Sequence, residues 1–345
     1  MVVRTMRVAQ ALCSTAAVLA LGTGCALMPP GEPAAAPGVS PAAAPAPSVP
    51  GTSSTAATHL PSAPATPPAS ASAVPGTSSP ATRPATPASP KSPVPDLTIA
   101  SVVNFRDAAG TGAGLPLAGG GHMVRGLVYR ASALVTLSKA DRTKLANIGV
   151  TDIYDLRTPG TASKYPDPAI GSAKYHLINL YATSKAKGAT GSTAEKRLAS
   201  RVRINREFVT DAAERARLAV MLKSFATAKG PVIVHCSEGK DRTGFVSAVL
   251  QLVAGVDQET IRTQYLMSND ARKDLIDADV AKVKASSGKA AADARRMDMT
   301  VYPQQIQASL DAIFENYGSV DKFLTKGVGL TQATVDKIRA KLQGP

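Results

Sequence analysis

The sequence predicts an α/β protein with a mainly parallel central sheet flanked by helices. From residue 97 onward, short segments rich in β-branched and aromatic residues alternate with segments of helical periodicity. One of the short segments, PVIVH (231–235), is apolar enough to be a strand buried on both faces. The run GFVSAVLQLVAGV (244–256) is apolar nearly all round, which is typical of a central buried helix.

The predicted strands share a high content of β-branched and aromatic residues. They are GLVYR (126–130), DIYDL (152–156), KYHLINL (174–180) and PVIVH (231–235). Ser138 and Asp141 have the spacing of a helix cap, and Gly149 marks the end of the helix that they begin. Further helical patterns cover 205–228, 258–298, 306–314 and 334–342. The predicted fold is therefore an α/β core with additional helices.

The chain divides into three regions by composition. Residues 1–25 predict a signal peptide, with Arg4 and Arg7 before an apolar run of small residues. Its end, LGTGC, is similar to a bacterial lipobox, so Cys25 is a candidate lipidation site, and a cut after Ala26 is the alternative. Residues 26–95 hold most of the 26 prolines and no aromatic residue, which predicts a disordered tether. Residues 96–345 are the predicted catalytic domain of an exported protein, either secreted or anchored to the cell envelope by lipid.

The cysteine count singles out one residue. Cys13 and Cys25 belong to the export region, which leaves Cys236 as the one cysteine of residues 96–345. Exported domains usually use cysteines in disulfide pairs. A cysteine without a disulfide partner in such a domain indicates a chemical role, such as that of a nucleophile.

The charge is strongly basic, at +14 for the whole chain. An excess of Lys and Arg favours anionic partners, and a solvated basic surface explains it equally well. The sequence shows no basic patch interleaved with aromatic residues and no nucleic-acid motif, so nucleic acid is not an expected partner. His122 and His176 lack the spacing of metal ligands, so no metal or other cofactor is implied.

The stretch HCSEGKDRTG (235–244) joins the apolar strand to the buried helix. Such a loop gathers backbone N–H groups at a helix N-terminus, where they bind phosphate and lower the pKa of a thiol. Arg242, six residues after Cys236, can hold two phosphate oxygens in a fork. Gly239 permits the tight turn between them. A buried structural cysteine and a polar turn form the alternative interpretation.

The loop resembles the active-site loop of the bacterial secreted tyrosine/dual-specificity phosphatases, within the protein tyrosine phosphatase superfamily. Four further segments are similar to that family: NFRDAAG (104–110), VYRASAL (128–134), IYDLRTP (153–159) and YGSVDKFLTKGVGL (317–330). The resemblance covers residues 98–345. It implies a tyrosine-phosphatase-like fold. Ala108, Ala109 and the pair Ser237–Glu238 depart from the family pattern.

The resemblance implies a role for each loop residue. Cys236 is the expected nucleophile, which forms a phosphocysteine, and Arg242 binds the phosphate. Asp241 is the favoured general acid, and Asp155 is the alternative, with an ion pair to Arg157 as its structural interpretation. The expected phosphate-binding residues are Ser237, Glu238, Gly239, Lys240, Asp241 and Arg242. Glu238 either weakens phosphate binding or binds a cationic group of the substrate.

Four residues are expected to support the loop. His235 orients it and favours the thiolate, and Thr243 hydrogen-bonds the sulfur or acts as a helix cap. Arg106 and Asp107 are expected to brace the site by ion pairing.

The expected activity is hydrolysis of phosphotyrosine in proteins. Phosphoserine, phosphothreonine and phosphoinositides stay open as further substrates. One alternative is a catalytically silent phosphate-binding pseudophosphatase. A cysteine hydrolase with a Cys–His dyad is the other, but it leaves Arg242 without a role.

Overall fold

The computed structural model describes residues 96–181 and 193–344. The predicted signal peptide, the tether and Cys25 lie outside the described residues. None of the described helices is both long and apolar enough to cross a membrane.

Five strands form one sheet in the order β1-β2-β5-β3-β4. The strands are β1 (Arg106–Asp107), β2 (Val128–Ala131), β3 (Asp152–Asp155), β4 (Lys174–Leu177) and β5 (Val232–His235). β2, β5, β3 and β4 are parallel, and β1 pairs with β2 in the antiparallel direction. The mainly parallel sheet predicted from the sequence is confirmed, with the short strand β1 as an addition.

Alternate residues of the central strand β5 face two separate hydrophobic clusters. Val232 and Val234 belong to the larger cluster, with side chains of α3, α4, α5, α8 and α10. Ile233 belongs to the smaller cluster, with Leu145 of α1 and the segment before β1. Both faces of the sheet are therefore covered, as the uninterrupted apolar sequence of β5 predicts.

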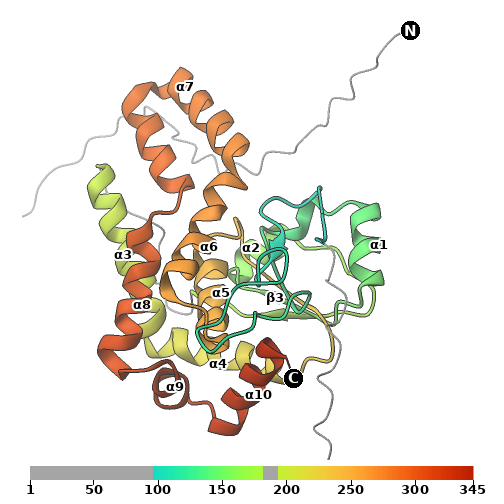
Figure 1. The fold of residues 1–345 in the computed structure, drawn as a ribbon. Helices are drawn as coiled ribbons and strands as arrows, with labels where there is room; N and C mark the ends of the chain where they lie inside the picture. The colour runs from blue at the N-terminus through green and yellow to red at the C-terminus, as the bar shows by residue number, and fades with distance from the viewer. Residues whose placement is uncertain (1–95, 182–192, 345) are drawn as a thin grey trace, which may run out of the picture. The chain divides into compact units, whose positions relative to one another are not determined.

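Helices pack around the sheet, and a further group of helices lies to one side of it (Figure 1). The helices that lie between the strands in the sequence, or directly after the last strand, are η1 (Leu134–Thr136), α1 (Lys139–Asn147), α2 (Pro159–Lys164), α3 (Ala194–Thr210), α4 (Ala212–Thr227) and α5 (Asp241–Ala254). The C-terminal ones are α6 (Gln258–Asp270), α7 (Lys273–Met299), α8 (Pro303–Tyr317), α9 (Val320–Lys322), the π-helix η2 (Phe323–Gly327) and α10 (Gln332–Gln343). Helix α5 is buried over nearly its whole length, which confirms the predicted central helix.

The helical pattern predicted over 205–228 is interrupted. Helix α3 ends at Thr210 and α4 begins at Ala212, although the sequence has no glycine or proline at this point. Asp211 has an extended backbone, and its carboxylate accepts hydrogen bonds from the N–H groups of Ala213 and Glu214. The side chain therefore caps a new helix where side-chain periodicity alone suggested continuity.

The parallel register places several strand ends at one edge of the sheet. His235, the last residue of β5, pairs with Ala131 of β2 and with Asp155 of β3. Ligand sites of parallel α/β sheets lie beyond the carboxyl ends of the strands. The loop after His235 thus leaves the sheet at the edge where a site is expected.

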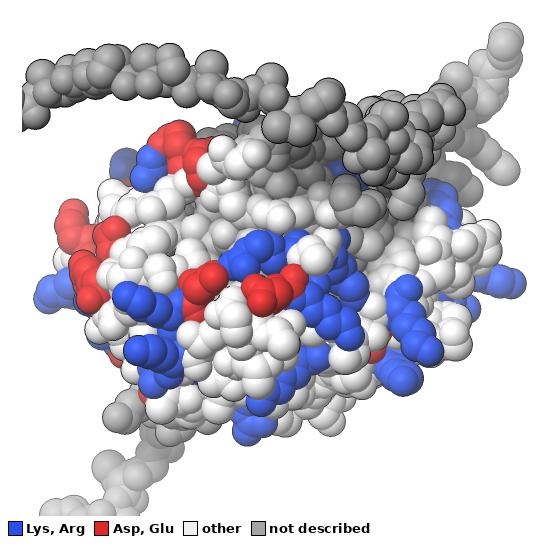
Figure 2. Space-filling view, turned by 60° about the horizontal axis from the view of Figure 1, so that its bottom comes forward, with Lys and Arg blue, Asp and Glu red and all other residues white. Residues whose placement is uncertain are grey.

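On the surface, the excess of Lys and Arg side chains is interspersed with Asp and Glu side chains. In Figure 2, Lys and Arg side chains form connected areas, and Asp and Glu side chains lie among them. Exposed ion pairs such as Arg206–Glu315 and Lys273–Asp277 contribute to this mixture. Much of the charge is therefore balanced locally on the surface.

Candidate active site

The loop between β5 and α5 turns sharply at Gly239. This residue has φ +66°, and a Cβ atom there would lie 2.4 Å from the carbonyl oxygen of Ala131 at the end of β2. Only glycine fits both the left-handed backbone and this close approach. The loop is thereby held against the neighbouring strand, with Cys236 at its start and the N-terminus of α5 at its end.

Two side chains bind the loop from β2 and from the segment before β1. Arg130 NH2 and Asn104 Nδ2 each donate a hydrogen bond to the carbonyl oxygen of Gly239, both at 2.8 Å. Asn104 has φ +61° and is itself bound by Arg106. These contacts leave the loop carbonyls satisfied, so the loop N–H groups can face a ligand.

Arg106 differs from the prediction that it braces the site by ion pairing, whereas Asp107 does pair with a cation, Arg125. Arg106 donates to Asn104, to the carbonyl oxygen of Gln264 and to Ser268, which are uncharged acceptors. The Asp107 carboxylate accepts hydrogen bonds from two backbone N–H groups and lies 3.7 Å from Arg125 Nε. Arg106 thus supports the loop through hydrogen bonds, and Asp107 stabilises the turn that leads into β2.

Cys236 is buried and unpaired, with 2 % of its surface exposed. Burial raises the pKa of its thiol, but the positive charge of Arg242 and hydrogen bonding from Thr243 outweigh burial and bring the pKa below the ordinary value. The start of α5 contributes in the same direction, since a helix N-terminus favours an anion. The site therefore favours the thiolate more than an ordinary cysteine environment does.

Arg242 points from the first turn of α5 toward the end of β3. Its NH1 group donates to the carbonyl oxygen of Leu156 at 2.9 Å, and its guanidinium stacks on the Tyr181 ring, 4.3 Å from the centroid. The side chain is thus fixed in place while part of its donor set is left for a ligand.

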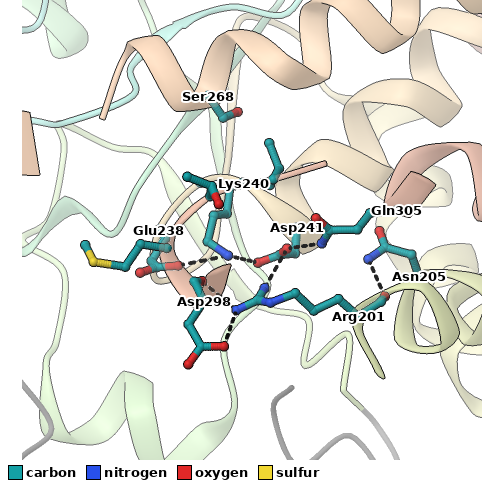
Figure 3. A network of polar contacts seen from close by, with 12 residues as sticks. Arg201, Asn205, Glu238, Lys240, Asp241, Ser268, Asp298 and Gln305 are labelled. Carbon is teal, nitrogen blue, oxygen red and sulfur yellow. Dashed lines mark hydrogen bonds and ion pairs between the residues drawn. The ribbon is translucent and has the colours of Figure 1, made fainter. Parts of the chain in front are cut away.

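Asp241 is the first residue of α5 and takes part in a polar network (Figure 3). Its carboxylate is bound by Lys240 Nζ at 2.8 Å, by Gln305 Nε2 at 3.1 Å and by Arg201 NH1 at 3.4 Å. Burial raises its pKa, but the charges of Lys240 and Arg201 outweigh burial and bring the pKa to about 2. In the unliganded site Asp241 is therefore an anion.

A cavity of about 170 Å³ adjoins this network. Its walls mix cations, acids and one aromatic ring: Tyr181, Arg201, Ile204, Asn205, Glu238, Lys240 and Asp241. Cys236 lies outside that wall, although Glu238, Lys240 and Asp241 belong to the same loop. The exposed residue Ser237 follows Cys236 directly and accepts a hydrogen bond from the Ala133 N–H through its carbonyl oxygen.

Asp155 lies in a second network, behind the loop. Arg157 binds both of its carboxylate oxygens through Nε and NH2, and the Tyr175 hydroxyl donates to it at 2.6 Å. Arg157 also pairs with Asp167. Burial raises the pKa of Asp155, but these partners outweigh it and bring the pKa below the ordinary value. The carboxylate has no exposed surface, whereas Asp241 lines the cavity.

His235 belongs to this second network too. Its Nε2 atom lies 3.3 Å from Asp167 Oδ2, and its Nδ1 atom lies 3.4 Å from the carbonyl oxygen of Cys236. Burial keeps the pKa of His235 below the ordinary value even though two acids lie near it. The ring thus positions the main chain at Cys236, which does not fit a Cys–His dyad.

Asp155, Asp167 and His235 bring ligand-type atoms within 4.8 Å of one another. Arg157 already contributes a positive charge to both carboxylates. A metal ion at this place would have to displace the guanidinium or be repelled by it. The donor set therefore fits an arginine-centred ion cluster rather than a metal ion.

Several residues of the site were not identified from the sequence. They are Asn104, Arg130, Asp167, Tyr181, Arg201, Arg272 and Gln305. A signal for Arg130 existed, because a charged residue inside an otherwise apolar strand needs a specific partner. Arg201 and Gln305 come from the distant helices α3 and α8, and Arg272 comes from the junction of α6 and α7, so no local pattern connects them to the loop.

The fold and this loop define a class: α/β proteins with a cysteine at the start of a loop that leads from a parallel strand into a helix N-terminus. The sequence pattern of the tyrosine phosphatase family matches residues 97–344. The triple specificity protein phosphatase PtpB of Mycobacterium tuberculosis is 30% identical over 280 residues, which cover 70% of this chain and 96% of the relative. A candidate tyrosine-protein phosphatase of Cupriavidus necator is 30% identical over 66% of this chain and 82% of its own.

The chain therefore belongs to the tyrosine phosphatase family. A tyrosine-protein phosphatase of Nostoc commune is a more distant relative, 25% identical over 62% of this chain and 73% of its own. The enzyme class predicted from the loop, a protein-tyrosine phosphatase, is confirmed by these matches.

Proposed function

We propose that the protein hydrolyses phosphotyrosine in proteins through a phosphocysteine intermediate. The observation that carries this proposal is the Cys236 thiol, whose pKa is lowered by Arg242 and Thr243 at the start of a glycine-turned loop. Family membership supports the overall reaction. The geometry supports the assignment of each step.

In the first step, the Cys236 thiolate attacks phosphorus. A sulfur–phosphorus bond forms and the bond to the tyrosine oxygen breaks. The loop N–H groups, the N-terminus of α5 and the free donors of Arg242 hold the non-bridging oxygens. In the second step, water attacks the phosphocysteine, and inorganic phosphate and the thiolate are released.

Asp241 supplies the proton to the leaving oxygen and takes one from water in the second step. It lines the cavity, whereas Asp155 is enclosed by Arg157 and Tyr175. Asp241 must be protonated to act as an acid. A dianionic phosphate next to it raises its pKa by repulsion and competes for Lys240, the cation that lowers the pKa most.

Phosphoserine, phosphothreonine and phosphoinositides are proposed as additional substrates. The relative from Mycobacterium tuberculosis is named for triple specificity. In this chain, Lys240 places a buried cation in the loop between two carboxylates, those of Glu238 and Asp241. A panel of these phosphomonoesters against the same enzyme preparation measures the order of preference.

The test of the proposed function is hydrolysis of p-nitrophenyl phosphate by the full chain in EDTA. We expect turnover in the wild type and none in Cys236→Ser. Turnover that persists in Cys236→Ser would exclude the mechanism. Phosphopeptide binding without any turnover by the wild type would support the pseudophosphatase instead.

We also propose that the chain is exported and acylated at Cys25. The N-terminal pattern before Cys25 supports this proposal. Labelling with radioactive palmitate tests it, with Cys25→Ala as the control. Equal labelling of both chains would contradict acylation at this cysteine.

A further inference from the structure

Glu238 is an acid inside a loop that otherwise attracts anions. Its two carboxylate oxygens bind two different cations: Oε2 lies 3.2 Å from Lys240 Nζ, and Oε1 lies 2.9 Å from Arg272 NH2. Both cations are almost completely buried, with 1% and 4% of their side chains exposed, whereas Glu238 is 38% exposed. The carboxylate therefore covers a buried pair of cations from the solvent side.

Among the described residues, the other partners of this cation pair supply little negative charge. Lys240 has a second partner in Asp241, but Asp241 is shared with Arg201. Arg272, at the junction of α6 and α7, otherwise donates to a neutral group, the carbonyl oxygen of Met299, at 2.5 Å. In Figure 3, Glu238 and Asp241 lie on opposite sides of the Lys240 ammonium group. Glu238 supplies this cation pair with a carboxylate that contacts both members.

Lys240 and Glu238 both line the cavity next to the loop. Phosphate bound by the loop and Arg242 would therefore have the Glu238 carboxylate as a neighbour. A second anionic group on the same substrate would need the place that this carboxylate occupies, beside Lys240 and Arg272. It would meet repulsion from Glu238 and find both cations already paired.

We propose that Glu238 is a specificity-determining residue: it occupies the Lys240–Arg272 cation pair and selects against substrates with a second anionic group beside the scissile phosphate. The inference rests on the proposed phosphatase function and specifies its substrate class as phosphomonoesters without an adjacent acidic group. Among the additional substrates proposed above, phosphoinositides with phosphates on neighbouring hydroxyls are therefore expected to rank last. It assigns Glu238 an inhibitory role toward anions. The alternative role, binding of a cationic substrate group, is weaker because both carboxylate oxygens already have cationic partners.

The test compares three phosphotyrosine peptides that differ only in the residues that flank the phosphotyrosine: Glu, Gln or Arg. The full wild-type chain is expected to prefer the Gln peptide to the Glu peptide by about tenfold in kcat/KM, the worth of one partly buried charge interaction. In Glu238→Gln, kcat/KM for the Glu peptide is expected to gain about tenfold relative to kcat/KM for the Gln peptide.

Two further variants separate the local effect from other causes. Glu315→Gln removes a carboxylate from an exposed pair with Arg206 and is the matched control, expected to leave all three peptides unchanged. In Glu238→Gln with Arg272→Gln, the gain for the Glu peptide is expected to be smaller than in Glu238→Gln alone, because one of the two freed cations is removed. Competitive inhibition provides a second measurement: in Glu238→Gln, pyrophosphate should inhibit about tenfold more strongly, while inorganic phosphate changes little.

The outcomes are distinguishable from those of the proposed function. No hydrolysis of any peptide by the wild type overturns the proposed function itself. Hydrolysis with equal Glu and Gln preference in the wild type overturns the role of Glu238, and this result does not depend on whether a variant folds. If the Glu peptide gains equally in Glu315→Gln, the gain comes from the more positive net charge of the protein, and this result overturns the local role of Glu238. A loss confined to the Arg peptide in Glu238→Gln makes Glu238 a cation-binding residue and also overturns the proposal.

Discussion

The Lys240 ammonium group donates a hydrogen bond to the Asp241 carboxylate, with 2.8 Å between Nζ and Oδ2. This contact joins a cation that can attract the substrate to the residue proposed to move the proton. It also explains why Asp241 is ionised before substrate binds, with a pKa of about 2. The proposed mechanism therefore couples substrate binding and proton transfer through one contact.

Asp241→Asn is expected to affect poor leaving groups most. Without the acid, kcat for phenyl phosphate should fall about a hundredfold or more, because its leaving oxygen needs a proton. For p-nitrophenyl phosphate, whose leaving group departs as an anion, the fall should be less than about tenfold. Steady-state kinetics on both esters measures this difference. An equal loss on both would contradict the role of Asp241 as general acid.

Asp155→Asn is expected to act through stability. The carboxylate is buried against Arg157, and loss of one partner of a buried ion pair costs about 3–5 kcal/mol. Urea unfolding of the variant should show this loss, and any remaining activity should be independent of the leaving group. Asp336→Asn, in an exposed pair with Arg339, is the control, with an expected change below about 1 kcal/mol. A leaving-group effect in Asp155→Asn alone would make Asp155 the acid.

Arg242→Ala is expected to make Cys236 a weaker acid. The pKa of the thiol is below its ordinary value in the folded protein, so alkylation should begin at a lower pH than for an ordinary thiol. Removal of the Arg242 charge raises the pKa, and the midpoint of the alkylation rate should move up by about one pH unit or more. Iodoacetamide labelling, followed peptide by peptide with mass spectrometry, measures the midpoint.

This labelling experiment contains its own reference. The same chain unfolded in urea reports Cys236 as an ordinary thiol. Arg206→Ala removes an exposed arginine and should leave the Cys236 midpoint unchanged. A Cys236 midpoint that stays the same in Arg242→Ala would show that this arginine does not stabilise the thiolate.

Gly239→Ala is expected to disrupt the loop. The alanine would have to adopt a left-handed backbone, and its Cβ would lie 2.4 Å from the Ala131 carbonyl oxygen. The free energy of unfolding should therefore fall by more than about 2 kcal/mol. Activity should be lost with it. Gly119→Ala, whose added Cβ meets no atom within 4 Å, should change stability by less than about 0.5 kcal/mol. Thermal unfolding of the two variants gives the comparison.

The sequence predicted the parts of the fold that depend on local patterns. The apolar composition of PVIVH and the cap at Ser138 predicted β5 and the start of α1, because both depend on neighbouring residues only. The break between α3 and α4 was not predicted. Asp211 can lie inside a helix or cap one, and its tertiary surroundings decide between the two.

For the site, too, the sequence predicted the residues of one continuous motif but not their partners from distant segments. Cys236 and Arg242 lie in one continuous motif, so their chemistry could be inferred from spacing. The contacts of Glu238 depend on Arg272, which lies more than thirty residues away and reaches the loop only through the packing of α6 and α7. Arg106 was expected in an ion pair, but a nearby carbonyl and hydroxyl satisfy it instead.

Rapid acid quench of the reaction with p-nitrophenyl phosphate, followed by mass spectrometry of the peptide that contains Cys236, tests the central claim most directly. We predict that within the first turnover this peptide carries one added phosphoryl group on sulfur, and that the amount decays as phosphate is released. Product formation without a phosphorylated Cys236 peptide at any time point would contradict the mechanism.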